Sequence, residues 1–351
     1  MAIPTLSLAS GGSIPVLGLG TFLATKPGEV GAAVTAAIKA GYRLIDCAAG
    51  YGNQAEVGAA IKEAIAEGVC TREELFIVSK LFQTHHVWEG DTSRCSESLE
   101  KTLTDLQLDY LDLFLIHWPF AFAEKKLEKP EGTPQPLRLP DGTPNPVFTI
   151  KMEYLQTWSC MESFVDCGKC KAIGVSNFSA AQLDHLLKSA RIPPSVNQIE
   201  VHPYFGQLEF IRWCDERKIR VMGYSPLGSA QGKMPPAQSF TLRDHPAVQK
   251  AAAEAGKTAA QILIRWGLQR CPTNFISIPK SSNEQRIAEN HAVFEWALTA
   301  EAMAALDGLE SGFRFFMSYF KRPENEVVWH GETIETGTDA DLVSSSRPSP
   351  A

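Results

Sequence analysis

The feature that most constrains the fold of this chain is an alternation of short apolar segments with longer amphipathic ones, running through most of its 351 residues. The short segments are rich in Val, Ile or Leu, which is typical of strands buried on both faces. Strands are predicted at Val16–Gly20, Leu44–Asp46, Leu75–Ser79, Leu111–His117, Ala172–Ser176, Val196–Glu200, Arg220–Tyr224 and Asn274–Ile278. Helices are predicted at Glu29–Ala40, Gln54–Glu67, Thr92–Leu106, Met152–Val165, Ala180–Ala190, Leu208–Arg217, Ala259–Arg270 and Asn283–Asn290. Eight such units predict an α/β fold, the parallel (β/α)8 TIM barrel.

Several segments lie outside this repeat. Thr5–Pro15 has the pattern of a hairpin and is expected to plug one end of the barrel. Glu124–Phe148 is dense in proline and is interpreted as an exposed insertion, and Ser225–Pro246 as a long loop. We therefore expect a single domain over residues 1–335, followed by a disordered tail at 336–351 that is rich in Ser, Thr, Asp and Pro.

Charge and composition exclude some classes of function. The net charge is −7, from 33 basic and 40 acidic residues, which disfavours a nucleic-acid or anionic-membrane surface. No apolar stretch is long enough for a transmembrane helix, and no secretory signal is visible, so a cytoplasmic location is expected. The eight cysteines are too sparse for a disulfide scaffold and are expected to be reduced. One close pair, Cys167 and Cys170, lacks the further ligands that a zinc site needs, so no metal is expected.

Every predicted strand from the second onward has polar residues at or near its carboxyl end. In a barrel of this kind the active site lies at the carboxyl ends of the strands, so these residues share one rim. Each taken alone has a simpler interpretation as a solvated or structural side chain. The residues at this rim are Asp46, Tyr51, Lys80, His117, Ser176, Asn177, Gln198, Tyr224, Ser225, Lys280 and Ser281.

Four of the rim residues together suggest acid chemistry on a carbonyl group. A tyrosine has a pKa of about 10, too high for efficient proton donation at neutral pH unless it is perturbed. A nearby ammonium stabilises the phenolate and lowers that pKa, and a carboxylate keeps the ammonium charged and fixed. An imidazole can hydrogen-bond the substrate oxygen. Adjacent strands provide these four parts as Asp46, Tyr51, Lys80 and His117.

Motifs around these residues resemble those of the aldo-keto reductases, most closely the fungal and plant aldehyde and aldose reductases. The match runs in order from about Leu6 to Gly312. Any one motif is weak, but the ordered set is highly specific. The motifs are Gly18–Phe22, Arg43–Asn53, Ile77–Leu81, Leu111–Pro119, Ile173–Phe178, Val196–Pro203, Tyr224–Ser229 and Ile278–Ser281.

The resemblance implies roles for these residues. Tyr51 would be the general acid that protonates the carbonyl oxygen, tuned by Lys80 and Asp46, while His117 would orient the carbonyl. The nicotinamide carboxamide would be held by Ser176, Asn177 and Gln198, with Tyr224 stacked on the ring. Ser225, Leu227 and Ser229 would line the pyrophosphate, and Gly20, Thr21, Phe22 and Asp46 would complete the cofactor contacts.

The cofactor implied by the resemblance is NADPH. No Gly-x-Gly-x-x-Gly turn opens a helix, so a Rossmann site is not supported. Instead, Lys280 and Ser281 directly precede a predicted helix that contains Arg286. The start of this helix, together with Lys280 and Arg286, would bind the 2′-phosphate. The resemblance adds Asn283 to this site and assigns Glu289 and Asn290 to the adenine. Asn283 replaces a more common threonine, which leaves some use of NADH open.

The substrate pocket is expected to be aromatic. Phe22, Phe82 and Trp118 fall where the family lines its pocket beside His117, and core packing is the simpler interpretation of each. The tail after Gly312 would form the variable C-terminal loop. Its Arg314 could pair with a carboxylate such as that of a uronic acid, although a surface cation beside packed aromatic residues is an equal alternative.

The predicted function is NADPH-dependent reduction of an aldehyde or aldose to an alcohol by a monomer that acts on a small-molecule carbonyl compound. A uronic-acid reductase is the first alternative. A cofactor-sensing binding subunit on the same barrel is the second, because such a subunit can retain all four rim residues. A metal-dependent hydrolase lacks a His/Asp ligand set.

Overall fold

The computed structural model describes residues 3–24, 26–122, 150–151, 154–229, 235 and 240–316. Within them, parallel strands form one sheet in the order β12-β11-β10-β9-β6-β5-β4-β3. Parallel bridges from Leu17 to Ser277 and from Gly20 to Lys280 join its two edges and close the barrel. The predicted fold is therefore confirmed: three strands have the predicted bounds, and each shifted strand end differs by one or two residues. The strands are β3 (Gly18–Gly20), β4 (Leu44–Asp46), β5 (Phe76–Leu81), β6 (Leu111–Ile116), β9 (Cys170–Ser176), β10 (Val196–Glu200), β11 (Arg220–Tyr224) and β12 (Phe275–Ser277).

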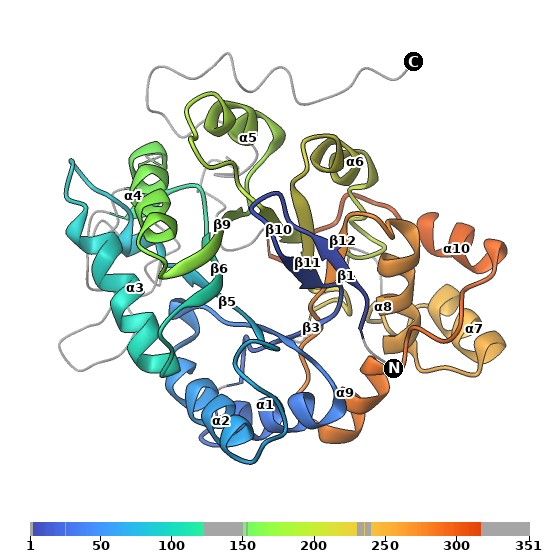
Figure 1. Ribbon diagram of the computed structural model, residues 1–351. Coiled ribbons are helices and arrows are strands. Elements are labelled where there is room, and N and C mark those ends of the chain that lie inside the picture. The colour runs from blue at the N-terminus through green and yellow to red at the C-terminus, as the bar shows by residue number, and fades with distance from the viewer. Residues whose placement is uncertain are drawn as a thin grey trace, which may run out of the picture.

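Helices surround the sheet, as the view along the barrel in Figure 1 shows. The eight predicted helices are all present, and the predicted bounds of α1 and α8 match the observed ones. Their bounds are α1 (Glu29–Ala40), α2 (Gln54–Ala66), α3 (Ser93–Leu106), α4 (Leu155–Asp166), α5 (Ala180–Leu187), α6 (Leu208–Glu216), α8 (Ala259–Arg270) and α9 (Glu284–His291). Short 3-10 turns, η1 (Ala49–Tyr51) and η2 (Gln83–His85), follow β4 and β5.

Two further helices, α7 (Pro246–Ala255) and α10 (Ala300–Asp307), were not predicted. The prediction ended a loop at Pro246, but proline is favoured in the first turn of a helix, and the His245 ring accepts a hydrogen bond from the Ala247 N–H. Helix α10 starts after Thr299, whose side chain accepts from the Ala302 N–H. Helix α7 is a second helix in the connection from β11 to β12, and α10 follows the last βα unit, so an alternation of one helix per strand gave no reason to expect them.

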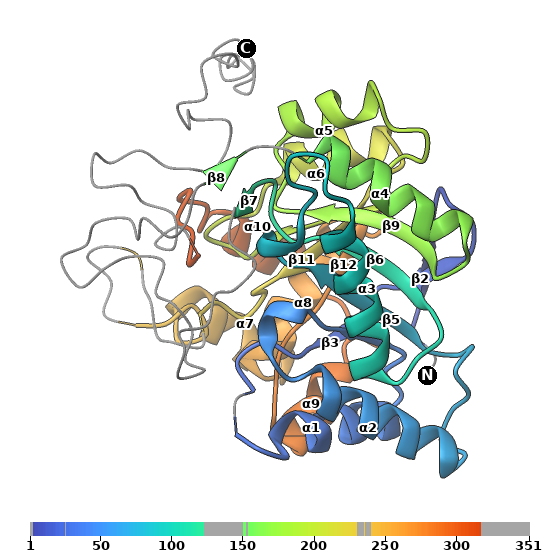
Figure 2. The same cartoon turned by 90° about the vertical axis from the view of Figure 1, so that its left-hand side faces the viewer.

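The N-terminal hairpin plugs the barrel as predicted. Strands β1 (Thr5–Ser7) and β2 (Ser13–Pro15) pair antiparallel, and Ile14 is fully buried. Leu8 and Ile14 pack with the apolar side chains of the barrel interior, such as Leu44 and Leu113. In Figure 2 the N-terminal end lies on the opposite side of the barrel from strands β7 (Ala121–Phe122) and β8 (Ile150–Lys151). One end of the barrel is thus filled with apolar side chains, which leaves the other end for polar chemistry.

The predicted insertion at 124–148 and the predicted tail at 336–351 lie outside the described residues, as does part of the loop at 225–246. All eight cysteines are free thiols, and Cys167 and Cys170 join no cluster of potential metal ligands among the described residues. In the same residues, no helix is long and apolar enough to cross a membrane.

Candidate active site

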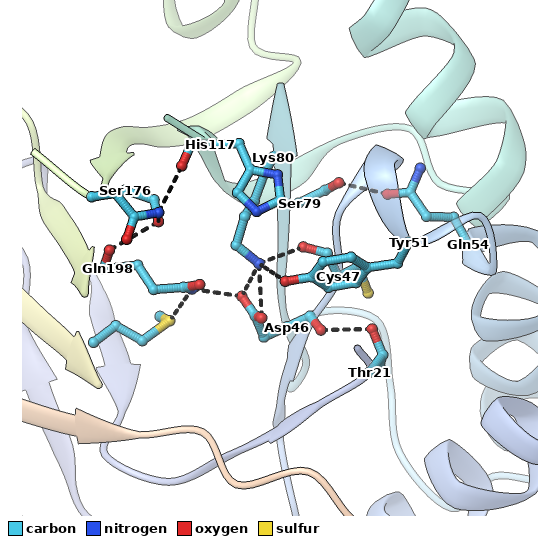
Figure 3. A network of polar contacts seen from close by, with 12 residues as sticks. Thr21, Asp46, Cys47, Tyr51, Gln54, Ser79, Lys80, His117, Ser176 and Gln198 are labelled. Carbon is cyan, nitrogen blue, oxygen red and sulfur yellow. Dashed lines mark hydrogen bonds and ion pairs between the residues drawn. The ribbon is translucent and has the colours of Figure 1, made fainter. Parts of the chain in front are cut away.

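Four polar side chains meet at the carboxyl ends of β4, β5 and β6 (Figure 3). The Lys80 ammonium lies 2.8 Å from each Asp46 carboxylate oxygen and donates to the Tyr51 hydroxyl at 3.2 Å. The Lys80 ammonium also donates to the Cys47 carbonyl at 2.8 Å. The Tyr51 and His117 rings lie edge to face, 5.8 Å between centroids. The structure therefore brings together the four residues predicted to be catalytic.

Parallel pairing explains why residues distant in sequence converge here. Asp46 ends β4, and Lys80 lies near the end of β5, directly alongside in the sheet. His117 directly follows β6, and its N–H donates to the Leu81 carbonyl at 3.1 Å, which extends the β5–β6 ladder by one bond. Tyr51 comes from the turn η1 and needs the αL residue Gly52 (φ 69°) behind it. Neighbouring strand ends thus carry every part of the cluster.

Burial dominates the electrostatics of Tyr51. Desolvation raises the pKa of this phenol well above its ordinary value, and the negative charge of Asp46 raises it further. The sequence-based expectation of a lowered pKa is therefore wrong in direction. The phenol is protonated at neutral pH, and the Lys80 ammonium lies at hydrogen-bonding distance from the oxygen that would carry the charge after proton loss.

His117 is a neutral imidazole at neutral pH. Burial lowers its pKa well below the ordinary value, and the positive charge of Lys80 lowers it further. Its Nδ1 atom is buried and has no hydrogen-bond partner among the described residues. A neutral imidazole can hydrogen-bond a substrate oxygen but has no proton to give up as an imidazolium acid.

Beside this cluster lies a layer of amide and hydroxyl groups from β9, β10 and β11. Gln198 donates to Asp46 at 2.8 Å, and the Tyr224 hydroxyl donates to the Asn177 amide oxygen at 2.9 Å. Asn177 also donates to the Ser176 hydroxyl and to the His117 carbonyl, and it adopts a left-handed backbone (φ 65°). These hydrogen bonds tie the predicted carboxamide-binding residues to the cluster of Asp46 and His117 and hold them in one orientation.

The loops that follow β3 and β11 complete this side of the rim. Thr21 donates from its hydroxyl to the Asp46 carbonyl at 2.9 Å, and a side chain on Gly20 would press on the Ile278 carbonyl. Ser225 has a left-handed backbone (φ 54°), and its carbonyl accepts from the Gly228 N–H in a turn that contains Leu227. Ser229 lies just beyond this turn.

The predicted phosphate site lies where β12 leads into α9. Ser281 is buried, and the Asn283 side chain caps α9 by accepting from the Arg286 N–H at 2.9 Å. Asparagine is thus a good N-cap at this position, which accounts for its presence in structural terms. Lys280 lies on β12's side of the turn, and Arg286 is exposed on the first turns of α9.

The far end of α9 carries the two predicted adenine contacts. The Asn290 side-chain oxygen is buried and has no hydrogen-bond partner among the described residues. Glu289 accepts from Gln285 at 2.8 Å. A buried, unsatisfied acceptor is suited to an amino group such as that of adenine.

An aromatic wall surrounds Tyr51 and His117. Phe22 lies 5.0 Å from Tyr51, Phe82 lies 6.3 Å from His117, and Trp118 stacks beside His117 at 6.4 Å, all between ring centroids. The three predicted pocket aromatics are thus at the rim rather than in the apolar core.

The model of the aldo/keto reductase family matches residues 16–311. Mouse aldo-keto reductase family 1 member A1 is 41% identical over 318 residues, which cover 90% of this chain and 92% of that protein. Arabidopsis thaliana aldo-keto reductase family 4 member C11 is 41% identical over 307 residues, 86% and 88% of the two chains.

Two solved structures are similar to this one. The Bombyx mori aldo-keto reductase in complex with NADP has a TM-score of 0.74 at 36% identity, with 90% of this chain and 95% of that chain covered. The Schistosoma japonicum aldose reductase has a TM-score of 0.77 at 36% identity, with the same coverage.

This chain belongs to the aldo/keto reductase family. It is therefore an oxidoreductase of a family that uses NADP(H) and acts on small-molecule carbonyl compounds. The resemblance found in the sequence motifs is confirmed.

One aromatic residue at the rim of this aldo-keto reductase was not predicted. Phe316 lies 5.6 Å from Tyr224 and 6.2 Å from Phe22 between ring centroids, so it adds the C-terminal segment to the aromatic wall. The run Phe313–Phe316 signalled an aromatic cluster, but the sequence alone did not show which ring faces the site. Phe315 instead is buried, with its N–H donating to Glu200 at 2.6 Å.

Arg314 of this reductase belongs to the same C-terminal segment but contacts a different ring. Its guanidinium stacks 4.0 Å from the centre of the Phe205 ring, within electrostatic reach of Tyr224. Its contact with a substrate carboxylate stays a prediction, and the stacking on Phe205 fits the alternative of a cation that packs beside aromatic residues.

Proposed function

We propose that this aldo-keto reductase reduces an aldehyde or aldose to an alcohol with NADPH, and that Tyr51 supplies the proton. The observation that carries the proposal is the fully buried Lys80 ammonium, which bonds Asp46 and the Tyr51 hydroxyl at once. Such a bridge fixes the phenol beside the imidazole of His117. The pair fits general acid catalysis on a carbonyl oxygen.

His117 and Tyr51 have different roles because they differ in the protons that they carry. His117 is neutral, so its ring N–H can hold the carbonyl oxygen without competing as the acid. Tyr51 is protonated, and the alkoxide-like oxygen that develops on reduction of the carbonyl carbon is basic enough to take a proton even from a phenol whose pKa is raised. When the proton leaves, the Lys80 ammonium stabilises the phenolate through the existing 3.2 Å contact, and Asp46 holds the ammonium in place.

The cofactor residues are assigned from the same rim. When bound, the reduced nicotinamide supplies the hydride. Ser176, Asn177 and Gln198 would hold its carboxamide, with Tyr224 against the ring. Ser225, Leu227 and Ser229 would contact the pyrophosphate, beside Gly20, Thr21 and Phe22. The fit rests on the buried acceptor of Asn290 near Glu289 for the adenine, and on the capped start of α9 for the 2′-phosphate.

Substitution of Tyr51 by Phe tests the acid role. Loss of the hydroxyl should lower turnover by roughly 10²–10⁴-fold, the usual contribution of a general acid, while NADPH binding stays near normal. Tyr110→Phe is the matched control, because Tyr110 directly precedes β6 at the opposite end of the barrel. Turnover of Tyr51→Phe equal to that of the control would remove Tyr51 from the acid role.

A panel of aldoses, simple aldehydes and uronates, with NADPH oxidation as the readout, tests the activity itself. Turnover of aldehydes by the wild type supports the reductase and argues against a cofactor-sensing binding subunit. Binding of NADPH without turnover of any compound would favour the binding subunit instead. A selective loss on uronates in Arg314→Ala would support the uronic-acid alternative.

A further inference from the structure

One cation of the proposed phosphate site already has an anionic partner in the protein. The Lys280 ammonium lies 3.5 Å from the Glu29 carboxylate and 3.5 Å from the Ser282 hydroxyl. Glu29 belongs to the first turn of α1, and Lys280 follows β12, so the contact joins the two ends of the barrel sequence. Arg286, the other cation of the site, forms no ion pair among the described residues.

Three neighbours hold the Glu29 carboxylate at this position. It accepts from the Lys26 N–H at 3.4 Å, it pairs with the Lys280 ammonium at 3.5 Å, and the Ser282 hydroxyl acts on it from nearby. These neighbours lower the pKa of Glu29, with Ser282 as the largest cause, so the carboxylate is charged at neutral pH. The negative charge therefore stands beside the ammonium proposed to receive a phosphate.

The pair is open to exchange. The side chains of Lys280 and Glu29 are 27% and 23% exposed, unlike those of the buried Lys80–Asp46 pair. Partly exposed ion pairs contribute little free energy, so an incoming phosphate dianion can displace the carboxylate. The dianion would then lie near a like charge, which disfavours binding.

We propose that Glu29 is a specificity-determining residue that weakens binding of the cofactor 2′-phosphate by competing with it for Lys280. The inference rests on the proposed assignment of Lys280 to that phosphate. Glu29 thereby reduces the preference for NADPH over NADH, which lacks the phosphate.

The test measures dissociation constants of NADPH and NADH by quenching of intrinsic fluorescence in the whole, cofactor-free protein. Glu29→Gln should bind NADPH about two- to five-fold more tightly, the range expected for removal of one exposed ion pair, with NADH affinity unchanged. The gain should shrink as salt is added, because exposed charges are screened. Glu67→Gln is the matched control: it removes the Glu67–Lys39 pair, 3.4 Å and likewise exposed, and should change neither constant.

Lys280→Met separates this inference from the proposed function. It should weaken NADPH selectively over NADH, and Glu29→Gln should then add no further gain. If Lys280→Met weakens both cofactors equally, the phosphate site is wrong and the inference falls with it. If Lys280→Met acts selectively but Glu29→Gln binds NADPH like the wild type, or tightens both cofactors alike, only the role of Glu29 is overturned.

Discussion

Two lysine–carboxylate pairs lie at the catalytic rim of this barrel and differ in almost every physical respect. Lys80 and Asp46 meet at 2.8 Å with side chains 0% and 3% exposed, and Lys80 also bonds Cys47 and Tyr51. Lys280 and Glu29 meet at 3.5 Å with about a quarter of each side chain exposed. The first pair lies among strand ends, whereas the second joins a loop to a helix start.

The difference shows how burial decides what an ion pair can do. Separating charges in a water-poor interior leaves an unpaired charge at high cost, so the inner pair acts as a permanent part of the site. Near water, the same charges are hydrated and screened, so the outer pair can exchange partners. One pair therefore suits catalysis that needs a fixed geometry, and the other suits recognition of an anion that arrives and leaves.

The largest effect is expected from Lys80→Met. This change leaves the Asp46 carboxylate buried without its cation, which should lower the free energy of unfolding by about 3–5 kcal/mol. Urea unfolding at neutral pH measures it. The double variant Lys80→Met with Asp46→Leu should recover part of the loss, because it removes the unpaired charge as well. A loss below about 1 kcal/mol for Lys80→Met would break the contrast between the two pairs.

A smaller effect, dependent on pH, is expected from His86, a fully buried group of the turn after η2. Burial, with the positive charges of His85 and Arg94, lowers the pKa of His86 to about 3. Above pH 6.5 both the folded and the unfolded chain carry it neutral, so it has no effect there. Below this value His86 binds a proton in the unfolded chain but stays neutral in the folded chain. The free energy of unfolding therefore falls as the pH falls.

The His86 contribution should reach about 2 kcal/mol at pH 5, given an unfolded pKa of about 6.5. His86→Gln removes it. The measurement is the difference in unfolding free energy between wild type and His86→Gln at pH 7 and at pH 5. A difference that does not change between the two pH values would mean that His86 titrates normally in the folded protein.

The smallest effect on stability is expected from Glu29→Gln. Loss of an exposed pair should change the unfolding free energy by less than about 1 kcal/mol, and salt should reduce even this change. Glu67→Gln removes the exposed pair between Glu67 and Lys39 of α1, and it should change the unfolding free energy by a similarly small amount. If Glu29→Gln lowers the unfolding free energy by several kcal/mol regardless of salt, the Lys280–Glu29 pair behaves like the buried Lys80–Asp46 pair. The contrast between the two pairs would then be wrong.

Many residues of the rim could be predicted from the sequence because the order of the parallel strands decides which strand ends are neighbours. Asp46 and Lys80 lie at the carboxyl ends of β4 and β5 and His117 directly follows β6, and the ends of these neighbouring parallel strands meet at one rim. The βα alternation likewise located the eight barrel helices. It could not locate α7 and α10, which lie outside the repeat.

Other parts of the site depended on contacts that no local pattern encodes. The choice of Phe316 rather than Phe315 for the aromatic wall follows from the burial of Phe315 against Glu200 and His202. The direction of the Tyr51 pKa follows from the balance between burial and the charge of Asp46. The contact between Glu29 and Lys280 joins residues about 250 positions apart and has no signature in either segment.

The sequence by itself determined the barrel, the family and the four residues at its catalytic rim, because alternating periodicity and residue order are local properties that survive in the unfolded chain. The tertiary structure alone decided which charges are buried and which face water. Those environments arise only when distant segments pack together, and they separate the fixed Lys80–Asp46 pair from the exchangeable Lys280–Glu29 pair.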